Sequence, residues 1–321
     1  MAAFVGYGKI PLGSCGEADS GGDWCVTDEK VHGANFSIHV DRCGSMRCAK
    51  RTAFLKEHED FFGHFGMLSR CRTDFRRLAE EVFQMAGAVV DTVTLFGELC
   101  GGKYPQKTVP EQPNVRPVQT GVWYSPCVEF VLFDIALCGP TGRSFMAFKS
   151  VAELAAKHKL PCVPVLLVGS RGDCANFNPK FESKVPAALG LPVLSGNFAE
   201  GIVVKPWEES TAAEDRPILK IKIQDFSEGG GCPPAPGDPA MRDYLLGQVN
   251  ANRLDSAASK VGSADVMDHW DAIVDLVMED IRDDVGEDPT LAALWPQLRC
   301  EAFDLLAARY AQGGEGDAEA S

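Results

Sequence analysis

The sequence lacks long hydrophobic runs: none approaches the about 18 to 20 apolar residues that a membrane-spanning helix requires. Its first residues, Met-Ala-Ala-Phe-Val-Gly-Tyr-Gly-Lys, also lack the charged and then apolar stretches of a secretory signal peptide. These two absences predict a soluble intracellular protein without a membrane partner. They do not indicate its compartment.

Basic residues are in deficit. The chain has 31 Lys and Arg against 45 Asp and Glu, a formal net charge of −14. This balance excludes a protein that coats nucleic acid nonspecifically, but it leaves room for a local basic channel. A length of 321 residues, with 45% hydrophobic and 24% charged residues, is typical of a globular protein with one large or two modest domains.

Closely spaced cysteine pairs are few. The 12 cysteines are scattered, without the density of a disulfide scaffold, which predicts reduced thiols inside a cell. Cys43 and Cys48 could form a zinc site with His58 and His64. No second close pair supports that site, so buried thiols are the interpretation that we favour.

Strand-like segments dominate the first 228 residues. Apolar and β-branched patterns predict strands around residues 24–27, 35–40, 89–98, 128–137, 162–168, 200–206 and 218–223, and helices over 69–86 and 150–157. Before them, Ile10-Pro11-Leu12 is expected to dock on the fold. Because the helices are interspersed irregularly rather than in a repeating βαβ order, the pattern predicts an α+β fold.

The composition changes after residue 228. Residues 229–240 are rich in Gly and Pro and predict an interdomain linker. Residues 241–312 carry amphipathic stripes typical of a small all-helical domain, with a break expected at Pro296. Residues 313–321 predict a disordered acidic tail.

The segment 28–36, Asp-Glu-Lys-Val-His-Gly-Ala-Asn-Phe, is the first candidate for chemistry. It predicts a strand, a tight turn and a second strand, with Lys30 at the turn and Gly33 permitting a close backbone approach. A lysine amine is a strong nucleophile only when it is neutral. Taken alone, the same pattern fits a hairpin with a solvated lysine, so the context must decide.

Charged residues also lie on later predicted strands. Lys220 and Lys222 alternate with apolar residues and therefore share one strand face. Burying two cations on one face costs free energy unless anions compensate. Two interpretations compete: either each polar residue lies on a solvated face, or they converge on a nucleotide, with an aromatic ring on the base, acids on a metal ion and cations on the triphosphate.

The order of these segments resembles that of the covalent nucleotidyltransferases. Within them it is similar to the second type of ATP-dependent RNA ligase, the group that contains a phage strand-repair ligase and the trypanosome RNA-editing ligases. The matching motifs, in order, are residues 29–36, 50–54, 96–99, 130–135, 200–206 and 219–228. The resemblance implies a nucleotidyltransferase domain of antiparallel sheets flanked by helices. The helical C-terminal part is similar to the phage type, and Ala34 departs from relatives with a hydroxyl residue there.

The resemblance implies an ATP-dependent RNA ligase that seals 3′-hydroxyl and 5′-phosphate ends, with nicks in a duplex as the expected substrate. Lys30 would form lysyl-AMP, AMP would pass to the 5′-phosphate, and the 3′-hydroxyl would displace it. The expected partner is a nicked RNA duplex or an RNA–DNA hybrid, bound by a monomer. The alternatives are a ligase acting mainly on DNA or hybrid nicks, and a non-catalytic RNA-end-binding protein.

The resemblance also implies roles for individual residues. Catalytic roles fall to Lys30, His32, Lys220 and Lys222, the last two holding the α-phosphate and favouring a neutral Lys30 amine by repulsion. ATP contacts fall to Glu29, Val31, Asn35, Arg51, Glu98, Phe133, Glu200 and Lys205, with Phe133 stacking on adenine. Glu200 and Glu98 would hold Mg²⁺, with Mn²⁺ as a substitute. Nucleic-acid contacts fall to Arg51 and Arg253. The group Arg70, Arg72, Arg76 and Arg77 is either a solvated helix face or a further phosphate contact.

Overall fold

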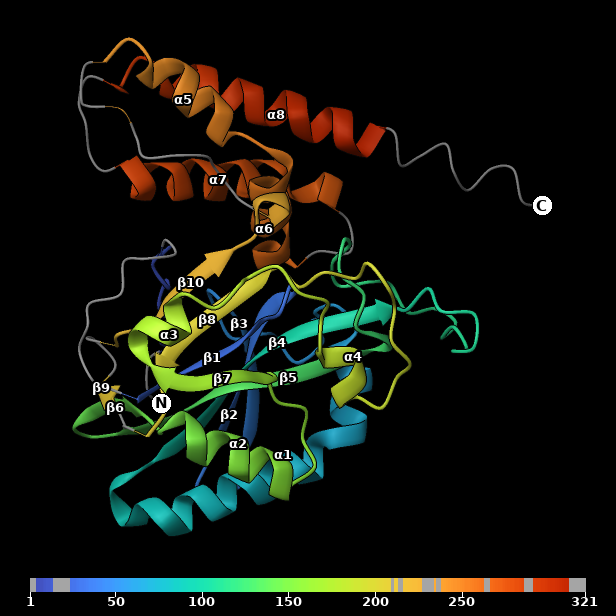
Figure 1. Ribbon diagram of the computed structural model, residues 1–321, viewed down its shortest axis with the longest axis vertical. Helices are drawn as coiled ribbons and strands as arrows, with labels where there is room; N and C mark the ends of the chain where they lie inside the picture. Colours follow the sequence, from blue (N-terminus) through green and yellow to red (C-terminus); the bar gives the residue numbers. More distant parts are fainter. Residues whose placement is uncertain are drawn as a thin grey trace. The chain divides into compact units, whose positions relative to one another are not determined.

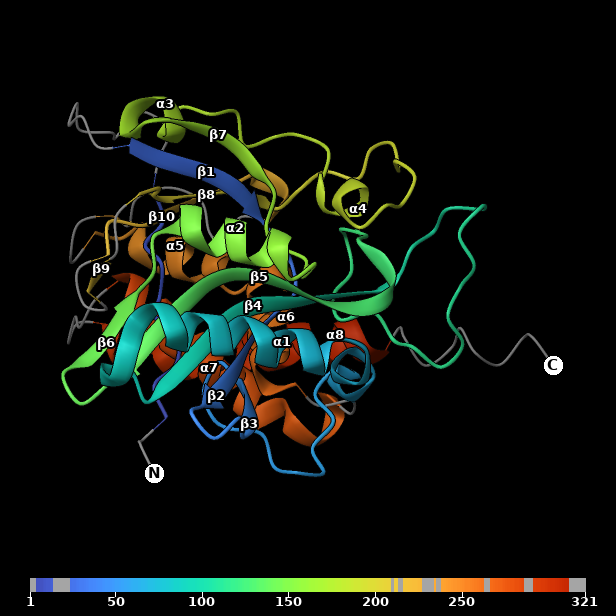
Figure 2. The same cartoon turned by 90° about the horizontal axis from the view of Figure 1, so that it is seen from below.

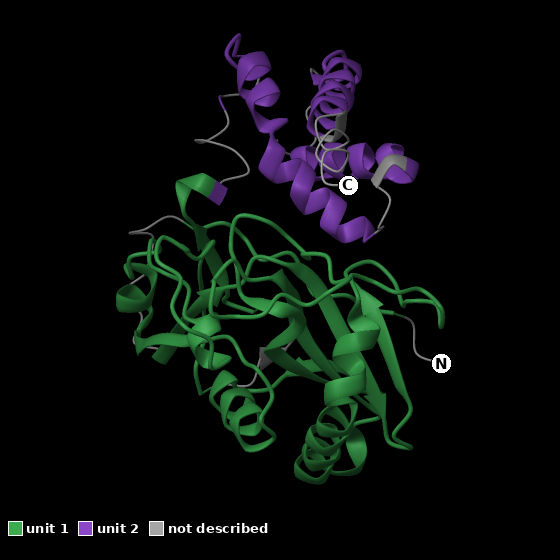
Figure 3. Cartoon of the chain, turned by 90° about the vertical axis from the view of Figure 1, so that its right-hand side faces the viewer, with its two compact units in different colours: residues 1–225 green, residues 226–321 purple. Residues whose placement is uncertain are grey.

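The computed structural model describes residues 4–13, 24–208, 211–212, 216–226, 234, 238–262, 266–285 and 291–311 (Figure 1). The chain divides into two compact units, residues 1–225 and 226–321 (Figure 3). The sequence placed this boundary at residue 228. Most of the predicted linker and the whole predicted acidic tail lie outside the described residues.

Unit 1 is built on two antiparallel sheets (Figures 1 and 2). The large sheet has the strand order β3-β2-β4-β5-β6-β9, formed by Met46–Lys50, Ala34–Asp41, Thr92–Lys103, Ser125–Gly139, Gly142–Phe145 and Thr211–Ala212. The small sheet has the order β10-β8-β1-β7, formed by Leu219–Lys222, Gly201–Pro206, Trp24–Lys30 and Val165–Ser170. Figure 2 shows the strands of the small sheet along one side of β4 and β5.

Each sheet buries one apolar face under helices. On the large sheet, Phe75 of α1 (His64–Ala86) packs edge-on against Phe130 of β5, with ring centroids 5.4 Å apart. On the small sheet, Ile202 and Val204 of β8 cluster with Cys174 of α3 (Arg171–Ala175). Further helices are α2 (Phe148–Lys157), α4 (Val185–Ala188) and the short 3₁₀ helices Gly87–Val89 and Gln224–Phe226. The predicted α+β class with antiparallel sheets is confirmed.

The predicted strand, turn and second strand around Lys30 are present, but the two strands do not form the alternative hairpin. Strand β1 pairs with β7 and β8, whereas β2 pairs with β3 and β4. The turn between them therefore carries the chain from one sheet to the other. A Cβ atom at Gly33 would lie 2.0 Å from the carbonyl oxygen of Leu99, so only glycine allows the turn to lie this close to β4.

Three element boundaries also differ from the sequence prediction. The predicted strand 162–168 begins only at Val165 and lies half-buried at the edge of the small sheet. Residues 87–89 form a 3₁₀ helix, and the strand expected from residue 89 begins at Thr92. Both helices of unit 1 predicted from periodicity are present, and α1 begins five residues before Ser69, at His64.

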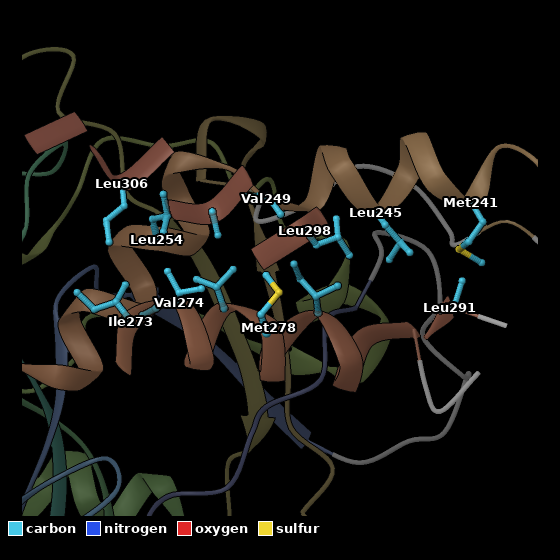
Figure 4. Packing of buried hydrophobic residues seen from close by; sticks show 14 residues of the cluster. Met241, Leu245, Val249, Leu254, Ile273, Val274, Met278, Leu291, Leu298 and Leu306 are labelled. Carbon is cyan, nitrogen blue, oxygen red and sulfur yellow. The ribbon is translucent and has the colours of Figure 1, made fainter. Parts of the chain in front are cut away.

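The described residues of unit 2 form helices and no strands: α5 (Met241–Gln248), α6 (Ala251–Val261), a 3₁₀ helix (Val266–His269), α7 (Trp270–Val285) and α8 (Trp295–Ala311). Their apolar stripes meet in one core that includes Leu245, Leu254, Val274 and Leu298 (Figure 4). Pro296 does not break α8 as predicted, because it lies in the first turn, where a missing N–H costs nothing. No helix among the described residues is long and apolar enough to cross a membrane.

Candidate active site

The inner face of the small sheet, which faces the large sheet, is lined with charge. Residues opposite each other on antiparallel strands point to the same face. Lys30 and Lys222 both lie opposite Gly201, and Asp28 and Lys220 both lie opposite Val203. Lys205 belongs to the same face and donates from Nζ to the carbonyl oxygen of Phe133 on β5, at 2.7 Å. Both predicted lysines of β10 are thus brought to the face that carries Lys30.

Glu200 lies between two of these lysines. Its Oε2 is 2.7 Å from Nζ of Lys30, and its Oε1 is 3.0 Å from Nζ of Lys222. His32 Nδ1 lies 3.4 Å from the same Oε2. The Glu200 side chain is 3% exposed, and burial by itself would raise its pKa. The two lysines outweigh burial, so the pKa of Glu200 falls well below its ordinary value.

Glu98 is a second carboxylate close to Lys30. It points from β4 toward the inner face, opposite Asn35 of β2, and it accepts the main-chain N–H of Gly33. Burial raises the pKa of Glu98 to about 7, helped by repulsion from Glu200 and opposed by Lys30 and Arg51. Glu98 thus lies opposite Asn35 and interacts electrostatically with both Lys30 and Arg51.

Phe133 lies at a bulge of β5, where the pairing with β4 shifts between Phe96 and Gly97. Its half-buried ring meets the edge of the Tyr7 ring, with centroids 5.0 Å apart. The Tyr7 hydroxyl donates to Asp134 at 2.7 Å, and Arg216 donates to the same carboxylate oxygen at 2.7 Å. Sequence reasoning missed Tyr7 and Arg216, because each lies in a short irregular segment without a motif.

The predicted docking segment 10–12 contacts β10. The main-chain N–H of Lys220 donates to the carbonyl of Pro11 at 3.1 Å, and that of Gly13 donates to the carbonyl of Lys220 at 3.0 Å. Leu12 thereby forms a parallel bridge with Lys220. The N-terminal segment thus contacts both the predicted base-stacking ring, through Tyr7, and the strand that carries the two lysines.

Lys205, whose Nζ donates to the Phe133 carbonyl, also contacts Asp28 and Phe148. Its buried ammonium lies 2.8 Å from Oδ2 of Asp28 and 3.6 Å from the centroid of the Phe148 ring. Burial raises the pKa of Asp28 to about 6, although Lys205 opposes the shift. The sequence prediction that Lys205 contacts ATP needs correction: its ammonium holds the Phe133 carbonyl and Asp28.

Glu29 also differs from its predicted role. Its side chain lies on the opposite face of β1 from Lys30, because neighbouring strand residues alternate. There it accepts the Ser183 hydroxyl at 2.5 Å and the main-chain N–H of Lys184 at 2.7 Å. The carboxylate therefore anchors the segment before α4 and does not face Lys30. Val31, buried directly after β1, belongs to the turn that positions the site.

The predicted nucleic-acid contact at Arg253 is contradicted by its burial in unit 2. Arg253 is 2% exposed, and its Nη2 donates to Oε1 of Gln248 at 3.1 Å. It lies on the buried face of α6 with Leu254 and Ala257. All four predicted arginines of α1 are exposed, and Arg70 also donates to the Val128 carbonyl at 2.6 Å.

The considered zinc site is not formed. The described residues contain no group of three or more His, Cys, Asp or Glu side chains that could hold a metal ion. The cysteines in the described part of the chain are free thiols, and Cys43 is exposed rather than buried as expected.

Comparison with known proteins identifies the family. Residues 23–222 match the family model described as RNA ligase. The chain belongs to the RNA ligase family. The matched range includes every predicted site residue of unit 1, from Glu29 to Lys222, so the family predicted from the sequence is confirmed.

Two trypanosome proteins are similar to this member of the RNA ligase family. RNA-editing ligase 1, mitochondrial, of Trypanosoma brucei brucei is 27% identical over 319 residues, covering 80% of this chain and 68% of its own length. RNA-editing ligase 2, mitochondrial, of strain 927/4 GUTat10.1 is 30% identical over 244 residues, covering 68% of this chain and 57% of its own length. The chain therefore spans little more than half the length of the second relative.

Two solved structures illustrate the structural comparison. An archaeal ATP-dependent RNA ligase (form 2) matches this chain with a TM-score of 0.40 at 16% identity. The match covers 94% of this chain and 64% of the archaeal chain. Naegleria gruberi RNA ligase with PPi has a TM-score of 0.40 at 13% identity, covering 64% of this chain and 51% of its own.

Proposed function

We propose that this protein is an ATP-dependent RNA ligase that joins 3′-hydroxyl and 5′-phosphate RNA ends at nicks, through lysyl-AMP on Lys30. One observation carries the proposal. Lys30 and Lys222 bind opposite oxygens of the buried Glu200 carboxylate, on the charged face between the two sheets. That arrangement lies inside the part of the chain that matches the RNA ligase family.

The first step is capture of AMP. Nζ of Lys30 attacks the α-phosphorus of ATP, an N–P bond forms, the bond to the bridging oxygen breaks, and pyrophosphate leaves. Lys30 must lose a proton for this attack. Glu200 is too weak a base to retain that proton, because its pKa lies well below the ordinary value, so its role is to position the amine and the proton passes to water. Lys222 and Lys220 oppose the negative charge that develops on the α-phosphate.

The base and ribose bind on the large-sheet side of the site. Phe133 stacks on adenine. The Tyr7 ring contacts the Phe133 ring edge to face, and Nζ of Lys205 donates to the main-chain carbonyl of Phe133. Glu98 accepts hydrogen bonds from the ribose hydroxyls. Each of these contacts positions the α-phosphorus for in-line attack. Such positioning supplies most of the catalysis in phosphoryl transfer.

Glu200 and Glu98 are the residues that would hold Mg²⁺ with ATP. Two carboxylates suffice because Mg²⁺ keeps several waters and takes phosphate oxygens as further ligands. The two carboxylates fit a cation, since repulsion from Glu200 contributes to the raised pKa of Glu98. A bound Mg²⁺ would offset the negative charge of the triphosphate.

The later steps use the same pocket. AMP passes from Lys30 to the 5′-phosphate of RNA, and the phosphoramidate bond breaks as a phosphoanhydride forms. The 3′-hydroxyl then attacks the 5′-phosphate and AMP leaves. Arg51, which lies near Glu98, is placed to meet the phosphate of the RNA end.

Labelling and sealing assays test the proposal. The protein is incubated with α-³²P-labelled ATP and Mg²⁺, denatured and separated by electrophoresis. Covalent label is expected in wild type and absent in Lys30→Met, whereas the exposed Lys56→Met should label normally. Nicked RNA, DNA and hybrid duplexes with 3′-ribose or 3′-deoxyribose ends then compare substrates. Label that persists in Lys30→Met rejects the nucleophile, and efficient sealing of 3′-deoxyribose ends alone rejects the RNA preference.

A further inference from the structure

Two aromatic side chains close in sequence to Tyr124 and Glu200 each have a lysine over the ring. Nζ of Lys103 lies 5.6 Å from the centroid of the half-buried Trp123 ring. Nζ of Lys180 lies 5.3 Å from the centroid of the Phe198 ring, which is 36% exposed. Both lysines are exposed. None of these four residues takes part in the proposed chemistry at Lys30.

Asn197 joins the two chain segments that carry these rings, through hydrogen bonds to the main chain of Trp123. Its buried side chain accepts the main-chain N–H of Trp123 at 2.8 Å and donates to the Trp123 carbonyl at 2.7 Å. Phe198 is the next residue and forms a bridge with Glu182. The Glu182 carboxylate accepts the N–H of Gly196 at 2.9 Å. The aromatic pair is therefore held on supported backbone.

Both rings lie close to the nucleophile along the chain. Trp123 precedes Tyr124, whose hydroxyl accepts the main-chain N–H of His32 at 2.8 Å, at the turn after Lys30. Phe198 precedes by two residues the Glu200 that pairs with Lys30. Two residues of extended chain span about 7 Å. A strand that stacks on these rings would thus place its end near Lys30.

The chemistry of this surface suits unpaired nucleic-acid bases. Surfaces that bind single strands combine aromatic rings for stacking with cations for the phosphates. An exposed lysine–aromatic contact is weak, so a base can displace the lysine toward a phosphate. The chain as a whole is acidic, with a net charge of −14. Two exposed lysines beside two aromatic rings give it local positive charge for the phosphates of RNA.

We propose that Trp123 and Phe198, with Lys103 and Lys180, bind unpaired RNA bases that extend from the duplex beside the nick. This inference rests on the proposed function, since binding of this unpaired segment would hold the nicked RNA at Lys30. The rings stack on the bases, and the lysines bind the neighbouring phosphates.

Binding of RNA by ring variants tests the proposal. Anisotropy of a fluorescent, 5′-phosphorylated, 3′-blocked single-stranded RNA is measured without ATP for Trp123→Ala, Phe198→Ala and the double variant. Each single variant is expected to weaken binding by roughly 5- to 100-fold, the value of one stacked base. Self-adenylylation should be unchanged. Trp24→Ala and Phe65→Ala remove exposed aromatic rings elsewhere, 62% and 43% exposed, and should bind RNA as wild type does.

Salt dependence tests the lysines. In Lys103→Ala and Lys180→Ala, the slope of log affinity against log salt should fall by about 0.7 each, the release from one single-strand phosphate. Lys149→Ala, which removes a lysine paired with Glu208, serves as the control. Trp123→Phe keeps a ring on the same backbone and should retain most of the affinity, which separates stacking from loss of fold.

Two negative results have different meanings. Wild-type affinity in the double ring variant, from a protein whose wild type labels and seals, overturns this inference and leaves the proposed function standing. A wild type that binds RNA through these rings but never forms covalent AMP overturns the proposed function instead. Equal losses in the Trp24 and Phe65 controls would also contradict the assignment of this surface.

Discussion

Nζ of Lys30 lies 2.7 Å from Oε2 of Glu200, although 170 residues separate them along the chain. The contact joins the last residue of β1 to the residue before β8, and the same carboxylate binds Lys222 of β10. One buried acid therefore aligns two amines whose proposed roles differ, one as nucleophile and one as the cation for the α-phosphate.

Loss of the Lys222 ammonium should slow formation of lysyl-AMP without preventing folding. In Lys222→Ala, Glu200 keeps its pairing with Lys30, but one charge that faces the α-phosphate is gone. Removing one donor of this kind typically costs 10²- to 10³-fold in rate, so a loss of about 100-fold is expected. Single-turnover labelling with ATP measures it, with Lys149→Ala as the control. An unchanged rate would show that Lys222 serves only to hold Glu200.

Glu98→Gln should change how stability depends on pH. Because the pKa of Glu98 is raised to about 7, the folded state binds this proton more firmly than the unfolded state does. Its contribution to stability therefore falls as pH rises from about 4.5 through 7. Relative to wild type, the variant should gain about 2 kcal/mol in the free energy of unfolding at pH 8, less than the full shift because the side chain is only partly buried.

Urea unfolding of both proteins at pH 5 and pH 8 measures this gain. The exposed Glu57→Gln is the matched control and should leave the pH dependence as it is in wild type. A gain of equal size at both pH values would contradict a titrating Glu98. The same variant should label more slowly with ATP, because the proposed ribose and metal contacts are lost.

Lys205→Met should destabilise unit 1 most at high pH. The change leaves Asp28 buried without its cation, which costs about 3–5 kcal/mol when the carboxylate is charged. The pKa of Asp28 is already raised to about 6, and it should rise further without Lys205. The loss of stability should therefore be small at pH 5 and grow as pH rises above about 6.

The double variant Asp28→Asn/Lys205→Met provides the control. Removing both charges should recover most of the stability lost in Lys205→Met. The remaining loss should not depend on pH. The KM for ATP should remain raised, because Phe133 no longer has a donor at its carbonyl. Thermal unfolding across pH 5–8, with ATP titrations of labelling, separates the two effects. Equal destabilisation at all pH values would argue against the buried pair.

Gly33→Ala should displace the turn that carries Lys30. The added Cβ would lie 2.0 Å from the Leu99 carbonyl oxygen and 2.9 Å from Cγ of Glu98, so the backbone must shift. A misplacement of about 1 Å can cost 10²-fold in rate, and a similar loss of labelling is expected. Gly66→Ala in α1 meets no atom within 4 Å and should instead stabilise the protein by about 0.5–1 kcal/mol. Normal labelling by Gly33→Ala would reject this account of the turn.

The sequence by itself determined the local features and their order. Alternation around Ile221 placed Lys220 and Lys222 on one face, and the Gly- and Pro-rich stretch separated a strand-rich part from a helical one. The motif series identified the family that the comparison confirmed. These features depend on period, composition and spacing, which a single chain displays directly.

Only the tertiary structure decided which strands are neighbours and which face is inside. It separated β1 and β2 into different sheets, turned Glu29 away from Lys30, buried Arg253, and brought Tyr7 to Phe133. Periodicity shows that two residues share a face, but the partner of that face is set by contacts between distant segments. The same reason left Asn197 unnoticed until the fold brought it to the main chain of Trp123, 74 residues away in the chain.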